Sequence, residues 1–159
     1  MTIDADTFRS VLGRYASGIT VITTLDDEGR DVGMTVSAFC SVSLHPPMVQ
    51  VCVDTVASMY PALQGCERFG VSILASEQEP LSRRFAAVDS MHRFEGLGYS
   101  RGESGVVLLD DALAHLECRL VAKHDAGDHT IFLGEVESAS ARDGRPMLYY
   151  RGGYAQLER

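Results

Sequence analysis

The sequence lacks any apolar run that approaches the roughly 20 residues needed to cross a bilayer. Its first six residues, Met-Thr-Ile-Asp-Ala-Asp, lack the basic start and the apolar centre of a secretory signal peptide. It also lacks a Cys-x-x-Cys pair, because Cys40, Cys52, Cys66 and Cys118 lie far apart among apolar or small neighbours. We therefore expect a soluble cytoplasmic protein with no membrane contact, in which the cysteines are buried free thiols rather than disulfides or zinc ligands.

Several nucleotide and metal motifs are also missing. No Gly-x-Gly-x-x-Gly follows a strand-like segment, so the doubly wound dinucleotide fingerprint is absent, and no phosphate-loop motif for ATP or GTP occurs. The five histidines include no pair four residues apart with an acidic partner, so we expect neither a zinc hydrolase nor any other metal site.

Positive charge is scarce, since 14 Lys and Arg oppose 22 Asp and Glu for a formal net charge of −8. This balance disfavours nucleic-acid binding, which needs a concentrated basic face. The 159 residues are 45% hydrophobic and 23% charged, an ordinary globular composition. With no repeat and no linker-like segment, we expect residues 1–159 to form a single domain.

Hydrophobic periodicity predicts many strands and few helices. Helical patterns cover residues 4–16 (with Asp4 or Asp6 as the cap), 54–63 (with Pro61 near the end) and 77–87. Strand patterns cover residues 19–25, the segment from 31 onward, and residues 48–53, 69–74, 112–122, 130–139 and 147–150. Residues 87–105 show no clear period and are expected to form a long loop. This pattern favours a mainly β fold, and a barrel in particular, because closure removes aggregation-prone edges.

Residues 33–47 form a stretch rich in small residues and hydroxyls. It carries Thr35, Ser37, Ser41 and Ser43 and ends at a Pro-Pro pair. Hydroxyls and unhindered backbone N–H groups can hold an anion or a sugar through hydrogen bonds. The same composition also fits a strand pair whose hydroxyls satisfy local backbone groups. Composition leaves both interpretations open.

The stretch runs Gly-Met-Thr-Val-Ser-Ala-Phe-Cys-Ser-Val-Ser-Leu-His-Pro-Pro, and it resembles the flavin-binding signature of the flavin reductase family. A second motif, Gly127-Asp128-His129, supports the resemblance, which covers nearly the whole chain. It implies an FMN-binding split β-barrel, usually a homodimer, that uses NADH or NADPH to reduce FMN or FAD. The reduced flavin then leaves for a partner flavin-dependent monooxygenase.

The resemblance places a first set of flavin contacts in the Ser/Thr stretch. Backbone and side-chain groups there would line the isoalloxazine and ribityl chain, with Ser41 near the phosphate and Ser43 as a further contact. The set is Thr35, Val36, Ser37, Ala38, Ser41 and Ser43. Many relatives have two consecutive serines where this chain has Ser37-Ala38, so one hydroxyl contact is expected to be absent. Cys40 is interpreted as a packing residue.

A second set of contacts matches a flavin-contacting strand end and a basic loop residue. The strand end contributes Cys52, Val53, Asp54 and Ser58. The alternative there is a strand end followed by a helix that Asp54 caps. Arg93-Phe94 aligns with a basic residue and Phe that bind flavin phosphate, where most relatives have Lys; the planar fork of Arg also suits phosphate. Without the resemblance, Arg93 would be interpreted as a solvated loop charge.

The resemblance assigns the nicotinamide side of the site to His129, Arg151 and Tyr154. Because hydride passes directly from the nicotinamide to the flavin, His129 is expected to position the nicotinamide rather than act as a general base. The alternatives are a structural or surface His129, and a strand end whose Gly-Gly turn carries Tyr154 to a subunit boundary.

We therefore expect an NAD(P)H:flavin oxidoreductase that supplies reduced flavin to a monooxygenase. NADH is favoured over NADPH because no basic cluster clearly matches a 2′-phosphate, although Arg83, Arg84 and Arg93 leave the question open. FMN is favoured over FAD. One alternative is a flavin-binding module without turnover, such as a sensor, a storage protein or a flavin chaperone. A more distant one is a pyridoxamine-phosphate oxidase-like or haem-utilisation enzyme on the same barrel.

Overall fold

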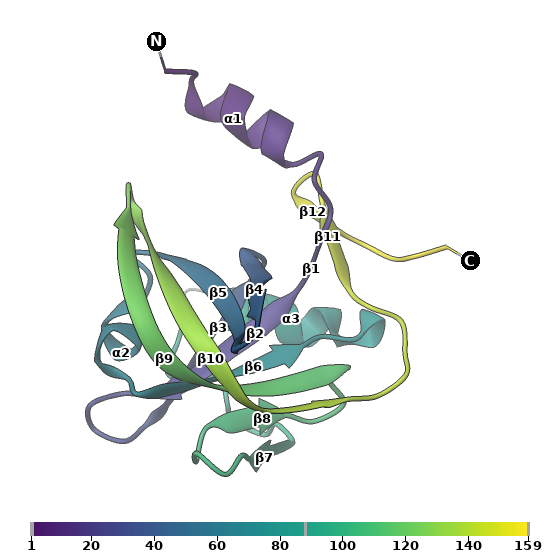
Figure 1. Ribbon diagram of the computed structural model, residues 1–159. Helices are drawn as coiled ribbons and strands as arrows, with labels where there is room; N and C mark the ends of the chain where they lie inside the picture. The colour runs from purple at the N-terminus through teal and green to yellow at the C-terminus, as the bar shows by residue number, and fades with distance from the viewer. Residues whose placement is uncertain (1, 88, 159) are drawn as a thin grey trace.

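The computed structural model describes residues 2–87 and 89–158, and Figure 1 shows their arrangement. The helical elements are α1 (Ala5–Leu12), α2 (Tyr60–Gly65), the 3-10 turn η1 (Ser76–Gln78) and α3 (Glu79–Ala86). The strands are β1 (Ser17–Gly18), β2 (Thr20–Leu25), β3 (Asp31–Val36), β4 (Phe39–Leu44), β5 (Pro47–Asp54), β6 (Arg68–Ile73), β7 (Tyr99–Arg101), β8 (Val107–Leu109), β9 (Ala114–Ala126), β10 (His129–Ala141), β11 (Leu148–Tyr150) and β12 (Gly153–Ala155). In this part of the chain, no helix has both the length and the apolar character required to span a membrane.

One curled sheet forms the body of the protein. Its strand order is β3-β2-β6-β9-β10-β5-β4, and every neighbouring pair is antiparallel. The long hairpin of β9 and β10 joins the two halves, because β6 pairs with the start of β9 and β5 pairs with the start of β10. Register shifts at Leu133/Gly134 and Val136/Ser138 let this hairpin bend. The mainly β fold, a split barrel, is thereby confirmed.

The two edge strands of this sheet, β3 and β4, are consecutive in the sequence. Only Ser37 and Ala38 separate them, yet the strands lie at opposite ends of the sheet order. A small sheet of β1, β11 and β12 stands apart from the barrel, and β7 pairs with β8. The expected Ser/Thr stretch therefore covers the corner at which the barrel is split.

Two apolar clusters stabilise this arrangement. The first fills the barrel and includes Ile22, Val51, Phe69 and Phe132, all at most 1% exposed. Gly134 makes room for it, because a Cβ at this position would lie 2.5 Å from the Phe69 ring. The second packs α3 against β8 and the C-terminal segment through Phe85, Leu109 and Met147.

Two predicted element boundaries and one predicted packing residue are wrong. The second helix starts at Tyr60 rather than residue 54, because Pro61 suits a first helical turn, and Asp54 instead accepts a hydrogen bond from the Val56 N–H (3.0 Å). The expected loop 87–105 contains β7, whose three residues are all exposed and therefore show no pattern; position 88 lies outside the described residues. Cys40 is exposed on the edge strand β4 rather than packed, whereas Cys118 is buried.

Helix α1 begins as expected, but none of its residues is buried by the parts of the chain that the structure describes. Asp4 caps it by accepting a hydrogen bond from the Thr7 N–H (2.9 Å), which lowers the pKa of Asp4. The apolar side chains of Phe8, Val11, Leu12 and Tyr15 are 53%, 60%, 50% and 79% exposed. Figure 1 shows α1 standing clear of the barrel, near β11 and β12.

A buried carboxylate holds the turn between β7 and β8. Glu117 on β9 is 5% exposed and accepts hydrogen bonds from the Ser104 N–H (2.9 Å), the Ser104 hydroxyl (2.6 Å) and the Glu103 N–H (3.3 Å). Burial acts to raise the pKa of Glu117, but these hydrogen bonds outweigh burial and hold it below its ordinary value. The ionised form therefore stabilises the folded state.

We expect Glu117→Gln to lower the free energy of unfolding at pH 7 by about 2 kcal/mol, because it removes the charge that three donors face. The folded-state pKa lies below the unfolded value, so this stabilisation is complete above the unfolded pKa of Glu and disappears as pH falls through the folded pKa. Urea unfolding of the wild type and the variant at pH 7 and pH 4 measures it. Glu103→Gln, the same change at an exposed neighbour, is the control. An equal difference at both pH values would contradict the assignment.

Candidate functional site

Residues 33–39 form a corner between the two edge strands, here called the β3–β4 corner. Ser37 and Ala38 are exposed at its apex. The Phe39 N–H donates to Ser37 O (2.9 Å), and the Cys52 N–H of β5 donates to Ala38 O (3.0 Å). The corner is thus tied to β5 while its outer side faces solvent.

The hydroxyls of the Ser/Thr stretch fall into two groups. Thr35 Oγ1 donates to Ser82 O of α3 (2.6 Å), a contact 47 residues away in the sequence. Within residues 2–87 and 89–158, the side chains of Ser37, Ser41 and Ser43 make no hydrogen bond. Satisfaction of local backbone groups therefore explains none of the four. The three serines leave hydroxyl groups available to a bound molecule.

The second predicted segment lies against the His129 hairpin. Asp54 of β5 pairs with His129 of β10 in the sheet register, and both the N–H and the hydroxyl of Thr55 donate to Asp128 O (3.0 and 3.2 Å). The side chains of Val36 and Val53 are buried in the barrel core, so only their backbone groups are available to a ligand. Sequence-distant segments thus meet at the end of β5.

His129 is oriented by the residue before it. Its Nδ1 lies 2.8 Å from Asp128 Oδ1, and this hydrogen bond lowers the pKa of the Asp128 carboxyl. A carboxylate only accepts, so Nδ1 is the N–H and donates. In the neutral imidazole, Nε2 is then left as an acceptor. The ring presents a fixed polar edge that suits an amide N–H of a bound molecule.

Arg93 faces the protein interior. Its side chain is 6% exposed; Nη1 donates to Gly33 O (2.6 Å), Nη2 donates to Ala87 O, and burial lowers the pKa of the guanidinium. Among the residues that the structure describes, its Nε is buried without a partner. Arg93 is therefore not a solvated loop charge, and it connects its own segment and Ala87 to Gly33 of β3.

Phe94 packs beside this arginine rather than at an open surface. Its ring meets Phe85 edge-on at 5.1 Å and Tyr99 edge-on at 6.3 Å. Gly33 permits this packing, because a Cβ there would lie 2.9 Å from the Phe85 ring and 3.1 Å from the Phe94 ring. Phe94 thus packs beside Gly33, the first residue of the β3–β4 corner.

The C-terminal residues form a hairpin that contacts α3 through the side chain of Tyr154. Arg151 (φ 51°) and Gly152 (φ 78°) make the two-residue turn between β11 and β12, and the Arg151 N–H donates to Gly13 O (3.0 Å). The Tyr154 hydroxyl hydrogen-bonds Ser82 Oγ (2.9 Å). No hydrogen bond or ring contact in the described structure joins His129 to Arg151 or Tyr154.

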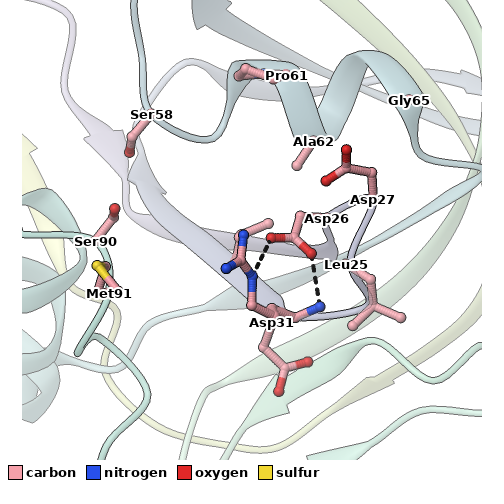
Figure 2. A pocket seen from close by; sticks show the side chains of 12 residues that line it. Leu25, Asp26, Asp27, Asp31, Ser58, Pro61, Ala62, Gly65, Ser90 and Met91 are labelled. Atoms are coloured by element: carbon pink, nitrogen blue, oxygen red, sulfur yellow. Dashed lines mark hydrogen bonds and ion pairs between the residues drawn. The ribbon is translucent and has the colours of Figure 1, made fainter.

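A cleft of about 530 Å³ lies between the β2–β3 turn, the start of α2 and residues 90–91, and Figure 2 shows its walls. Of the predicted site residues, only Ser58 lines it. Asp26 in this cleft binds the Arg30 guanidinium (2.8 Å) and Asp27 lies beside it, whereas Asp31 is paired with Arg101 (2.8 and 2.7 Å). Two carboxylates against the one guanidinium of Arg30 disfavour a phosphate, so the β3–β4 corner suits a flavin better than this cleft does.

Four of the predicted segments therefore converge on the β3–β4 corner. Arg93 donates to Gly33 O, and the Cys52 N–H donates to Ala38 O. Tyr154 is connected to Thr35 of the corner through Ser82. His129 lies opposite Asp54 on the adjoining strand β5. Sequence reasoning missed Ser82 as the connecting residue. Its signal was a serine beside the apolar face of the helix that carries Leu81 and Phe85.

Comparison with known proteins identifies the family of the chain. Residues 12–158 match the family described as flavin reductase like domain. A Rhodococcus sp. NADH-dependent flavin reductase is 44% identical over 152 residues, covering 94% of this chain and 85% of the relative. The reductase subunit HsaB of a flavin-dependent monooxygenase from Mycobacterium tuberculosis is 39% identical over 159 residues, covering 98% and 84%.

A solved structure matches the whole fold. The NADH:FAD oxidoreductase SgcE6 of Streptomyces globisporus C-1027, in complex with NAD and FAD fragments, superposes with a TM-score of 0.91 at 36% identity, covering 99% of this chain and 97% of that chain. The family match spans nearly the whole chain, and so do these relatives. The chain therefore belongs to the flavin reductase-like domain family.

Proposed function

We propose that this protein is an NADH-dependent flavin reductase that supplies reduced flavin to a partner flavin-dependent monooxygenase. The observation that carries the proposal is the β3–β4 corner, where Ser37 and Ser41 are exposed and free of hydrogen bonds while segments from across the chain converge. The relatives described above catalyse this reaction or are the reductase subunit of such a monooxygenase, by their names. FMN is the expected flavin, with FAD as the alternative.

The residues present fit a flavin at this corner. Exposed hydroxyls of Ser37 and Ser41 and the open backbone beside Ala38 are suited to a polar ring and its ribityl chain. Arg93 supports the corner from inside through its bond to Gly33 O, and its Nε, which has no partner among the described residues, is itself buried. When bound, the flavin supplies the acceptor for a hydride from the nicotinamide.

The protein contributes orientation rather than proton transfer. We propose that Thr35, Val36, Ser37, Ala38, Ser41, Ser43, Cys52, Val53, Asp54, Ser58, Arg93 and Phe94 surround the flavin, and that His129, Arg151 and Tyr154 border the nucleotide. Asp128 fixes the His129 ring so that Nε2 accepts from the carboxamide of the nicotinamide. This role needs no ionisation of the imidazole, so the histidine positions the nucleotide.

The occupation of three arginines supports NADH over NADPH. Arg83 is bound to Glu79 (2.8 and 2.6 Å), Arg84 donates to the carbonyls of His92 (2.8 Å) and Glu95, and Arg93 donates to Gly33 O and Ala87 O. A 2′-phosphate needs a free cationic fork to replace its hydration. Arg83 and Arg84 already have acceptors, and the one unpartnered nitrogen of Arg93 is buried, so NADPH would gain little over NADH.

We also propose that two copies form a homodimer through α1. A helix of eight residues is not stable by itself in water, and three large apolar side chains of α1 (Phe8, Val11 and Leu12) are exposed, as is Tyr15 just after it. The edge strand β4 likewise exposes Val42 (49%) and Leu44 (74%). A two-fold axis brings identical surfaces together and would cover both patches at once.

The reaction is tested by following NADH and NADPH oxidation at 340 nm with FMN, FAD and riboflavin. We expect turnover that saturates with added flavin, and a kcat/KM for NADH about tenfold or more above that for NADPH, which corresponds to about 1.4 kcal/mol. Purified protein that retains flavin but oxidises neither nucleotide would overturn the reductase function and favour a flavin-binding module.

His129→Ala is expected to raise the KM for NADH about tenfold, because it removes the polar edge that orients the carboxamide. Flavin affinity should change less than twofold. Stopped-flow and flavin titration separate the two quantities, and His124→Ala, at an exposed histidine on β9, is the control. Loss of flavin affinity with an unchanged KM would show that the histidine belongs to the flavin side.

Light scattering tests the dimer. We expect a mass near twice 17.3 kDa for the wild type at micromolar concentration. A Phe8→Ser/Leu12→Ser double variant should yield the monomer, because it removes apolar area that the second copy would cover. Ser10→Ala, on the opposite face of α1, should leave the dimer intact. A wild-type monomer, or a dimeric double variant, would contradict the proposed interface.

A further inference from the structure

Ser82 lies between the two halves of the candidate site, and we infer that it is a positioning residue that sets the nicotinamide side of the site relative to the flavin side. The inference rests on the proposed function. It assigns a role to a residue of α3 that none of the sequence motifs includes.

The contacts of Ser82 use two different atoms, so both exist at once. Its backbone oxygen accepts from Thr35 Oγ1 (2.6 Å), and its Oγ hydrogen-bonds the Tyr154 hydroxyl (2.9 Å). The residue is 0% exposed, which strengthens both bonds because no water competes. Thr35 belongs to the seven-stranded sheet and Tyr154 to the small sheet of β1, β11 and β12. Ser82 therefore joins two sheets that share no strand.

The remaining contacts of Tyr154 hold its ring but leave the direction of its hydroxyl to Ser82. The Arg83 guanidinium lies over the ring at 4.7 Å from the centroid, and Tyr149 meets it edge-on at 6.0 Å. Glu79 holds Arg83 in place by accepting from Nε (2.8 Å) and Nη2 (2.6 Å). The hydrogen bond to Ser82 Oγ is the contact that fixes the position of the hydroxyl at the end of the ring.

Loss of the Ser82 hydroxyl is expected to affect the binding of NADH but not that of the flavin. The Thr35 bond uses the carbonyl of Ser82 and survives any change of its side chain. The Tyr154 bond uses the hydroxyl and does not. Removing the hydroxyl therefore takes away the bond that fixes the Tyr154 hydroxyl on the C-terminal hairpin, which also carries Arg151, while the corner that holds the flavin keeps its attachment to α3.

The test compares Ser82→Ala, Tyr154→Phe and the double variant in NADH turnover and flavin titration. We expect each single variant to raise the KM for NADH about fivefold to tenfold, with kcat and flavin affinity changed less than twofold, since one neutral hydrogen bond is lost. The double variant should be no worse than either single variant, because both remove the same bond. Ser82→Thr retains a hydroxyl and should restore the KM.

Other outcomes overturn the inference. A lower melting temperature with an unchanged KM would make Ser82 a purely structural attachment, and additive effects in the double variant would show that the two residues act separately. If the wild type oxidises no NADH, the proposed function fails by itself. Calorimetric titration of NAD⁺ into the wild type, Ser82→Ala, Tyr154→Phe and the double variant then decides the inference. Equal binding of NAD⁺ by the wild type and Ser82→Ala overturns it.

Discussion

The hydrogen bond from the Cys52 N–H to Ala38 O (3.0 Å) holds the β3–β4 corner against β5, at the point where the barrel is split. Only Ser37 and Ala38 separate β3 from β4, yet β3 pairs with β2 and β4 pairs with β5, so the two strands diverge at the corner instead of forming a hairpin. Backbone and hydroxyl groups that a closed barrel would use for pairing stay available there. The candidate site is thus a consequence of where the sheet fails to close.

Long-range side-chain bonds replace the missing strand pairing around this corner. Three hydrogen bonds, each with a different element, do this: Thr35 to Ser82, Arg93 to Gly33, and Ser82 to Tyr154. The residues that form these bonds are buried or half-buried. Bonds of this kind fix position without filling the outer face of the corner. The inner side of the corner is therefore fixed by hydrogen bonds, while its outer side is accessible from solvent. This arrangement suits a flavin that must enter and leave.

Much of the barrel could be predicted from the sequence, because alternation along residues 112–139 and the β-branched run before residue 25 follow directly from burial of one sheet face. The corner itself was recognised by its motif, not by periodicity. The burial of Arg93 and the role of Ser82 could not be predicted, since both depend on contacts 47 to 72 residues apart. Helix α1 was predicted correctly, but periodicity cannot say which molecule its apolar face meets.

A crystal structure of the protein with bound flavin tests the central claim most directly, namely that the split between β3 and β4 is the flavin site. We predict that the isoalloxazine lies against residues 35–38, with the flavin phosphate near Ser41. A flavin found in the acidic cleft of Asp26, Asp27 and Asp31, or elsewhere away from the corner, would contradict the account.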